Sequence, residues 1–600
     1  MGRTSVVEEY IEKRTWRINE NANRIPSIGG LKTYIAEKAI AKYTLSLYPK
    51  EVREAHLNAA IHIHDLGHGI AGYCSCWSLP KILMKGFYGG NGTIKSKPPK
   101  HFTSALAQLL NFIGVISQEW AGAQAVNSFD TLLAPFIRYD GLSYRQVKQA
   151  LQEFIFSLNV ALRYGHETPF TNITFDLTTP SDLKNAPVII GGEPQSQTYD
   201  EFEEEREMIN KAFLEVLYEG DADGAVFRFP IPTYNITKDF GWGGEFSEIL
   251  AKATGMFGVP YFQNCISSGI HPEDVRAFCC RLNLDLRELR RKTGGLFGYN
   301  DETGSIGVVT INLAQIGFLA RDDSDFFEVL DERLEIAKEA LELKRQIVVQ
   351  NFERGLLPYT SQYLHTLDNH FSTIGVVGGE EMCLNFLECS IADEDGKNFA
   401  VKVLKHIRSR IEEFQRETGH LYNLEATPAE GCSYRLAKID RKRFGRKIIT
   451  SGTAKAPFYT NSTQLPVDCD FDLIDMLKHQ EELQCLYTGG TVFHVFLGEG
   501  IPESQCYGIV PNFITWLCTK FKLPYYTLTP TYSVCRKCSK RFSGEVRICE
   551  VCGCECEVYS RVVGYYSPTH AWNVGKKEEW KRRRVLSVGE ITKEQRGERG

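Results

Sequence analysis

Short apolar runs alternate with long amphipathic segments along most of this chain, and that alternation constrains the fold more than any other feature. The runs are bounded by glycine, proline or asparagine; they are GVVTINL (307–313), STIGVVGG (372–379) and TVFHVFLG (491–498). Their continuous apolar character suits strands that are buried on both faces. Strands that alternate with long helices predict a mainly α/β architecture.

Helical periodicity is clearest between Phe326 and Val348. Apolar residues recur there at spacings of three, four and seven, while Glu and Lys occupy the opposite face; the apolar positions are Leu330, Leu334, Ala337, Leu341 and Val348. Residues 31–60 and 104–160 are also predicted to be mostly helical.

Composition sets the broad class. The 600 residues are 43% hydrophobic and 24% charged, which gives ample material for a large core and argues against disorder. A formal net charge of -6 argues against a protein that coats nucleic acid.

The charged N-terminus has no signal-peptide core, and no run of about 18 apolar residues occurs, so we expect a cytoplasmic chain outside the membrane. The basic segment KKEEWKRRR (576–584) is interrupted by two glutamates and is predicted to be a solvated helix or arm.

Eighteen cysteines in a reducing compartment favour metal or catalytic use over a disulfide framework. Two Cys-x2-Cys pairs lie ten residues apart and can surround one Zn²⁺ tetrahedrally, as in a zinc ribbon; they are Cys535, Cys538, Cys549 and Cys552. Buried cysteines without a metal are the alternative. Cys554 and Cys556 follow in GCEC, where they can replace a ligand or serve as exchangeable thiols.

A glycine interrupts a strand-like run soon after these cysteines. Gly564 lies in SRVVGYYSP (560–568), where it weakens a strand and packs nothing. Such a glycine marks a turn, a bulge or a place where another group must approach the backbone closely.

The order of these features resembles the anaerobic (class III) ribonucleoside-triphosphate reductases, which are glycyl radical enzymes. The resemblance spans nearly the whole chain through WRINENAN (16–23), IHIHDLGHGIAGYCSCWSL (61–79), TPFTNITFD (168–176), FPIPTYNITKDF (229–240), AFCCRLNLD (277–285), TGSIGVVTINL (303–313), STIGVVGGEEMCLNF (372–386), YTGGTVFHVFLGE (487–499) and RVVGYY (561–566). The RVxGY pattern alone also resembles lyase and dehydratase members of the wider superfamily, which lack the ribbon.

The resemblance implies a ten-stranded α/β barrel with a small C-terminal zinc ribbon. We expect a catalytic domain over 1–530, the ribbon over 531–556, and a radical loop and tail over 557–600. Gly564 would carry the radical, because its Cα lies between an amide nitrogen and a carbonyl and no side chain prevents it from becoming planar. The resemblance assigns the relay thiol to Cys280, with Cys279 as the alternative.

The resemblance also implies the roles of groups around the ribose. A second sulfur is expected at Cys74 or Cys76, of which Cys74 is favoured. Glu381 is identified as the carboxylate that accepts a proton from a substrate hydroxyl, with Glu380 as its rival. His64 is a candidate substrate contact, although a buried hydrogen-bonded histidine beside Asp65 is the more ordinary reading.

One position departs from part of the family. Formate-using members carry an asparagine just ahead of the GVV strand, where this chain has Ser305. The substitution removes an amide that can donate to a formate oxygen. We therefore expect a reductant like thioredoxin or glutaredoxin, with Cys554 and Cys556 as a shuttle, and we keep formate as the alternative.

Phosphate binding has two short candidate segments. YTNSTQLP (459–466) contains Ser462 and Thr463, and YTGGT (487–491) contains Gly489 and Gly490. Both can present backbone N–H groups to phosphate oxygens if a helix follows; ordinary turns are the alternative. We expect no N-terminal ATP-binding cone, since the family pattern begins by residue 16, and we expect dNTP or ATP effectors at a dimer contact near a predicted helix over 118–130.

The predicted function is anaerobic synthesis of deoxyribonucleotides from ribonucleoside triphosphates by a homodimeric enzyme. The resemblance implies that a separate radical-SAM activase, with a 4Fe-4S cluster and S-adenosylmethionine, must activate it. A different glycyl radical lyase or dehydratase is one rival. A zinc-ribbon nucleic-acid binder without enzymatic activity is the rival from another class, and it predicts salt-dependent DNA binding.

Overall fold

The structure is a computed structural model that describes residues 5–272, 275–277, 283–285 and 302–597. Within these residues the largest sheet has 11 strands, ten of which follow one another in a single path. In order, the ten are β13 (Tyr422–Ala426), β12 (His370–Val377), β11 (Thr303–Asn312), β2 (Cys74–Trp77), β3 (Gln124–Val126), β4 (Thr171–Phe175), β7 (Ile231–Ile236), β8 (Tyr261–Asn264), β17 (Tyr525–Pro530) and β16 (Phe493–Leu497). The eleventh, β1 (Ile61–Ile63), runs antiparallel along β11.

The path consists of two parallel halves that meet in antiparallel pairs. Strands β2, β3, β4, β7 and β8 are parallel to one another, while β11 is antiparallel to β2 and β17 is antiparallel to β8. The two ends also meet, because Gly489 N donates to Leu424 O at 2.6 Å and Ala426 N donates to Gly490 O at 2.9 Å. The sheet therefore closes on itself, which confirms the predicted ten-stranded α/β barrel.

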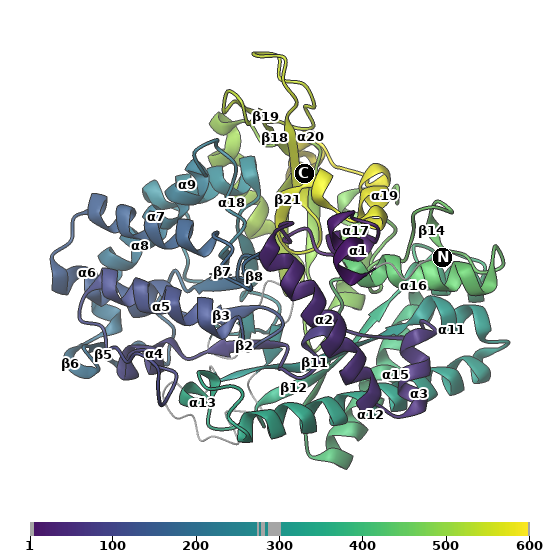
Figure 1. The fold of residues 1–600 in the computed structure, drawn as a ribbon. Helices are drawn as coiled ribbons and strands as arrows, with labels where there is room; N and C mark the ends of the chain where they lie inside the picture. The colour runs from purple at the N-terminus through teal and green to yellow at the C-terminus, as the bar shows by residue number, and fades with distance from the viewer. Residues whose placement is uncertain (1–4, 273–274, 278–282, 286–301, 598–600) are drawn as a thin grey trace.

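Helices cover the outside of this barrel. Figure 1 shows α5 (Phe102–Ile116), α6 (Phe129–Asp140), α7 (Tyr144–Leu158), α8 (Glu203–Glu219) and α9 (Gly244–Phe257) beside one half, and α12 (Asp323–Glu353), α15 (Glu394–Thr418) and α16 (Gly431–Phe444) beside the other. The apolar face predicted for 326–348 is confirmed, since its five apolar positions are all buried in α12; they are Leu330, Leu334, Ala337, Leu341 and Val348.

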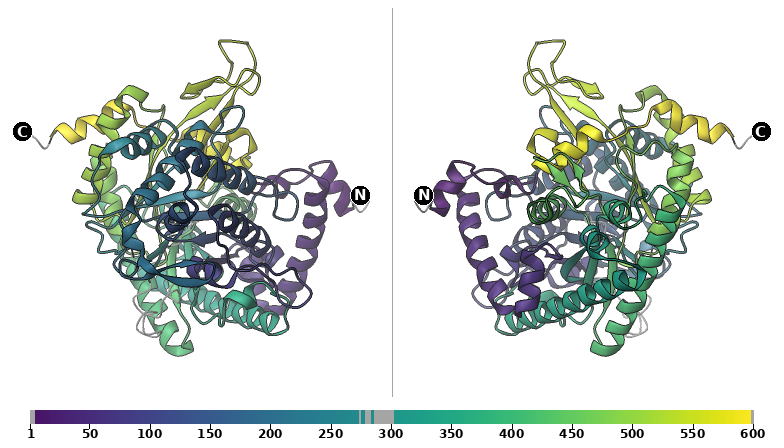
Figure 2. Two further views of the ribbon diagram at one scale, coloured as in Figure 1. Left: turned by 90° about the vertical axis from the view of Figure 1, so that its left-hand side faces the viewer. Right: turned by 90° about the vertical axis from the view of Figure 1, so that its right-hand side faces the viewer.

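A four-stranded antiparallel sheet follows the last barrel strand. Its order is β19 (Arg541–Ser543), β18 (Tyr532–Val534), β20 (Glu557–Arg561) and β21 (Tyr566–Pro568). The ring of Tyr532 packs edge-on against Phe257 of α9 at 5.3 Å, so this sheet shares a core with the barrel helices. Figure 2 shows its cysteine-bearing hairpin standing out from the body of the molecule.

The N-terminal helices reach the same region from the other end of the chain. Helices α1 (Val6–Ile11), α2 (Ile28–Leu47) and α3 (Lys50–Leu57) precede β1, and Asn573 Nδ2, just before α19 (Val574–Arg582), donates to Glu20 O at 3.4 Å in the segment between α1 and α2. No helix within the described ranges is both long enough and apolar enough to cross a membrane.

Two local predictions are wrong. The segment 118–130 is not one helix, because Gln124–Val126 forms β3 in the barrel wall and nearly all of the segment is buried, which leaves little of it for a contact between subunits. The tail 576–584 is helical up to Arg582, which agrees with the helix form of the prediction, but it is not solvated throughout. Three of its charged side chains are at most 3% exposed in and after α19, where they pair with one another; they are Lys576, Glu579 and Arg583.

Candidate active site

Gly564 lies at the tip of a hairpin that enters the barrel. Strands β20 and β21 pair up to Arg561 and Tyr566, and Val562 N donates to Tyr565 O at 3.2 Å to close the turn. The flanking side chains are buried in one cluster with the barrel residues Cys74, Tyr261 and Tyr525. The apolar residues around the glycine therefore hold the turn inside the barrel.

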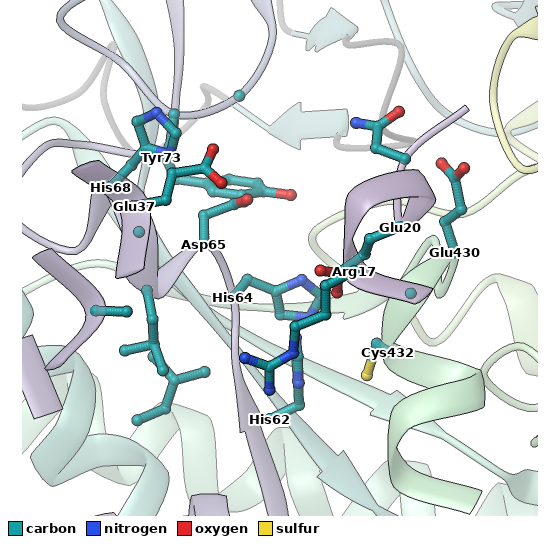
Figure 3. Close-up of a pocket in the computed structure, with 18 of the residues that line it drawn as sticks. Arg17, Glu20, Glu37, His62, His64, Asp65, His68, Tyr73, Glu430 and Cys432 are labelled. Carbon is teal, nitrogen blue, oxygen red and sulfur yellow. The ribbon is translucent and has the colours of Figure 1, made fainter. Parts of the chain in front are cut away.

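A cavity of about 430 Å³ opens at this tip. Its wall brings together segments that are far apart in the sequence: Cys74 from β2, His64 after β1, Glu430 before α16, and Gly564 from the hairpin. Figure 3 shows Glu20, Glu430 and Cys432 on one side and Glu37, His68 and Tyr73 on the other. The volume lies in the range of small-molecule sites.

Glu430 is the carboxyl group of this wall that contacts the Gly564 hairpin. Its Oε1 accepts from Ala22 N at 2.8 Å, and its Oε2 accepts from the Tyr565 hydroxyl at 3.2 Å. Burial raises the pKa of Glu430 to about 7, against the lowering effect of the Ala22 N–H. The group can therefore both hold and release a proton near neutral pH. Sequence reasoning missed Glu430, although a carboxylate in TPAEG (427–431), directly after the strand β13, was a signal of a site residue.

The cavity also separates the two candidate sulfurs. Cys74 lines it, and Cys74 Sγ accepts from Ala123 N at 3.2 Å. Cys76 is buried without lining the cavity, and Asn127 Nδ2 donates to its sulfur at 2.8 Å. The geometry therefore favours Cys74.

Glu381 lies away from this cavity in α14 (Gly379–Phe386). It is fully buried and accepts hydrogen bonds from Thr460 N at 3.0 Å and from the Ser451 hydroxyl at 2.6 Å. Burial raises the pKa of Glu381 to about 7. Its neighbour Glu380 accepts from Ile391 N at 2.8 Å, which is a structural contact.

Ser305 is buried within β11, where its hydroxyl bonds to Thr373 Oγ1 at 2.8 Å, and it does not line the cavity.

The candidate phosphate segments also lie outside the cavity wall. Thr463 Oγ1 bonds to the Tyr487 hydroxyl at 2.8 Å, and Ser462 O accepts from Gly379 N at 2.8 Å at the start of α14. Gly489 and Gly490 close the barrel against β13. The prediction required a helix that follows the segment in the chain. The helix that begins beside Ser462 is instead α14, which precedes it.

His62, His64 and Cys432 present donor atoms within 4.8 Å of one another. Arg435 donates to His62 Nδ1 at 3.3 Å, which puts a guanidinium beside the three donors. Burial, with Arg435 second, lowers the pKa of His64 to about 3, so the imidazole is neutral. Since a divalent cation would lie beside this fixed positive charge, we interpret the group as a neutral wall of the cavity.

The cysteines of the hairpin form a group that suits a metal. Cys535 Sγ and Cys552 Sγ are 3.4 Å apart, Cys538 Sγ and Cys549 Sγ are 3.6 Å apart, and all four sulfurs lie within 4.8 Å of one another. Tetrahedral Zn–S bonds of about 2.3 Å place sulfurs about 3.8 Å apart, so the four thiols fit a zinc ion. Cys554 and Cys556 are outside this group of four and are partly exposed.

The predicted relay thiol, Cys280, lies outside the described residues, as does its alternative Cys279.

Comparison with known proteins agrees with the fold. A model of the family "Anaerobic ribonucleoside-triphosphate reductase" matches residues 20–585. The enzyme of that name from Haemophilus influenzae is 25% identical over 97% of this chain and 85% of its own length. A solved "Anaerobic ribonucleotide reductase" superposes with a TM-score of 0.78 at 23% identity, covering 97% of this chain and 93% of the other. The reductase from Thermotoga maritima, solved in complex with dATP and CTP, gives a TM-score of 0.74 at 22% identity over 95% of this chain and 97% of its own. Because the family model spans nearly the whole sequence, this chain belongs to the anaerobic ribonucleoside-triphosphate reductase family.

Proposed function

We propose that the enzyme reduces ribonucleoside triphosphates with an unpaired electron that is stored on the Cα atom of Gly564 and passed to the sulfur of Cys280. The observation that carries the proposal is the position of the Gly564 turn. It lies inside the barrel and lines one cavity together with Cys74 and Glu430. A backbone radical at this turn is protected from solvent and close to a space that a ribose can enter.

The resemblance supplies the order of steps. The Cys280 sulfur takes the 3′ hydrogen, the 2′ hydroxyl leaves as water, and the 3′ hydrogen returns after reduction. Glu430 is suited to the proton transfers, since its pKa of about 7 lets it donate to the leaving hydroxyl or accept from the 3′ hydroxyl. Cys74 is suited to be the second thiol. Glu381 remains the alternative candidate for these proton transfers, on the sequence resemblance alone.

The electrons are proposed to come from a small dithiol protein like thioredoxin or glutaredoxin. The balanced reaction converts a ribonucleoside triphosphate and a dithiol into a deoxyribonucleoside triphosphate, water and a disulfide. The support for this choice is the sequence difference at Ser305, which replaces the asparagine of formate-using members; Ser305 itself lies in β11 outside the cavity wall. The partly exposed Cys554 and Cys556 are suited to pass electrons from the partner.

Further partners follow from the radical. A radical-SAM activase with a 4Fe-4S cluster must abstract a hydrogen from Gly564. The Thermotoga maritima reductase was solved in complex with dATP and CTP. We propose that the present enzyme uses CTP as a substrate and responds to deoxynucleotide or ATP effectors as a cytoplasmic homodimer. The zinc-binding hairpin at 531–556 and the radical loop and tail at 557–600 are proposed to act as separate units of the C-terminal region.

The test is dCTP formation from CTP by the activated enzyme under anaerobic conditions. We expect product with a thioredoxin or glutaredoxin system and none with Cys280→Ser or Cys74→Ala, whereas Cys76→Ala retains product formation. Turnover with formate alone, in an assay free of redoxin, would contradict the proposed reductant. Failure to convert any ribonucleotide, with the radical present, would favour a different glycyl radical reaction.

A further inference from the structure

We propose that Arg561 and Tyr261 form a two-donor clamp on the carbonyl oxygen of Gly564 and that this clamp stabilises the radical. Arg561 Nη1 donates to that oxygen at 3.1 Å, and the Tyr261 hydroxyl donates to the same atom. The inference rests on the proposed function, in which Gly564 carries the unpaired electron. Both residues are positioning residues, because neither reacts with the substrate.

Arg561 brings a buried positive charge to this oxygen. It is 2% exposed, and within the described chain its other hydrogen-bond partners are the Thr529 hydroxyl at 3.2 Å and the carbonyl oxygens of Gly258 and Val259. Its guanidinium also lies over the rings of Tyr261 at 4.4 Å and Tyr566 at 4.8 Å. These partners are neutral, so the charge remains available to polarise the Gly564 carbonyl.

Tyr261 reaches the same oxygen from a different element. It belongs to β8 in the barrel wall, and its ring stacks on Tyr525 of β17 with centroids 5.0 Å apart. It is fully buried. Since Arg561 ends β20 and Tyr261 is fixed in the wall, the two donors converge on Gly564 from the hairpin and from the barrel.

The clamp acts on the part of the radical that accepts electron density. In a glycyl radical the amide nitrogen donates into the half-filled orbital and the carbonyl withdraws from it, so charge builds up on the carbonyl oxygen. Donors to that oxygen therefore stabilise the radical more than they stabilise the closed-shell glycine. A buried site strengthens the effect, because little solvent screens the guanidinium.

Tyr261→Phe removes one donor with the smallest possible change. Tyr566→Phe is the matched control: it makes the same substitution beside the same guanidinium, but the Tyr566 hydroxyl donates to Pro530 O at 2.8 Å and not to Gly564. All proteins are activated in parallel and the radical is counted by EPR. We expect an about fivefold lower ratio of radical to closed-shell glycine in Tyr261→Phe, equivalent to about 1 kcal/mol for one hydrogen bond, and no change in the control.

A second readout separates stabilisation from a merely structural effect. Protein labelled with glycine carrying ¹³C at the carbonyl reports the spin density there as a hyperfine coupling. We expect this coupling to change in Tyr261→Phe and in Arg561→Gln. The change should be smaller in Arg561→Lys, which keeps the charge, and absent in Tyr566→Phe. Equal coupling and equal radical yield in wild type and Tyr261→Phe would overturn the clamp.

A third measurement needs no variant. Deuterium ENDOR of the wild-type radical in D₂O detects exchangeable hydrogens that are bonded to the carbonyl oxygen. Couplings from both donors are expected, and their absence would overturn the inference even if a variant failed to fold. If the wild-type enzyme shows no radical on Gly564 at all, the proposed function fails first, so the two failures are distinguishable.

Discussion

Glu430 shows at the scale of single residues why the site was only partly predictable. GGEEM suggested Glu381 because that motif carries the family resemblance, and the strand predicted before it is present as β12. The structure instead puts Glu430 in the wall with Gly564, through a contact to Tyr565 that spans 135 positions. No local pattern encodes such a contact, since it depends on where the tail hairpin enters the barrel. Gly564 and Cys74 were predictable because their own motifs carry the resemblance.

Glu430→Gln is expected to lower kcat by about 10²-fold at pH 7, the scale of one general acid or base. The raised pKa of about 7 means that the carboxyl is protonated below neutrality and ionised above it. If Glu430 donates the proton to the leaving hydroxyl, kcat of the wild type falls as pH rises through 7, and the glutamine variant lacks this fall. Anaerobic kcat measurements between about pH 6 and 8.5 test this expectation.

Glu381→Gln provides the contrast, since its pKa is raised to about 7 by the same cause. If Glu381→Gln removes the pH dependence and Glu430→Gln preserves it, the assignment to Glu430 is wrong.

At the scale of elements, periodicity predicted well wherever an element packs on one face. The helix over 326–348 has one apolar stripe, and α12 buries it. The segment 118–130 was misjudged because its apolar residues form β3, which is buried in the barrel wall. The tail 576–584 was misjudged because charge was taken to mean exposure. Glu579 pairs with Lys576 three residues before it and with Arg583 four residues after it. This spacing lets the three charged side chains lie together on the buried side of α19.

Removing one member of that buried group tests its role. Glu579 Oε2 is 2.6 Å from Lys576 Nζ, and Glu579 Oε1 is 2.9 Å from Arg583 Nη2. Glu579→Gln leaves two buried cations without their carboxylate and is expected to destabilise α19 by about 3–5 kcal/mol, measured as local opening by hydrogen exchange.

Glu578→Gln is the matched control on the same helix. Its partners Lys581 and Arg582 are 72% and 38% exposed, so the loss is expected to stay below about 1 kcal/mol. Equal protection of α19 in both variants would show that the buried group does not stabilise the helix.

The four-cysteine hairpin is expected to hold the Gly564 turn in place, because β20 runs from the hairpin directly into residues 562–565. Cys549→Ser should lower bound zinc from about one ion per chain to a small fraction, as measured by elemental analysis, since structural zinc sites need all four ligands. We expect the yield of radical to fall with it.

Cys554→Ser is the control, because its sulfur is outside the group of four. Unchanged zinc content in Cys549→Ser, or loss of zinc in Cys554→Ser, would show that the ligand set is different.

At the scale of the whole molecule, both ends of the chain complete the cavity. The Tyr565 hydroxyl donates to Asn21 Oδ1 at 2.6 Å, and Asn573 Nδ2 donates to Glu430 O at 2.9 Å. The N-terminal segment and the tail therefore meet at the cavity, where Asn573 Nδ2 also lies 3.4 Å from Glu20 O. Apolar patterns predicted individual strands of the barrel. The closure between β13 and residues 489–490 depends on backbone hydrogen bonds, which no side-chain pattern reveals.

The account as a whole depends on where the unpaired electron resides. The most direct measurement is the EPR spectrum of the enzyme after anaerobic treatment with its activase, recorded for protein made with ordinary glycine and with glycine deuterated at Cα. We predict a doublet that collapses to a single line on deuteration and is missing in Gly564→Ala. A radical signal that persists in Gly564→Ala, or a doublet that deuterated glycine leaves unchanged, would contradict the account.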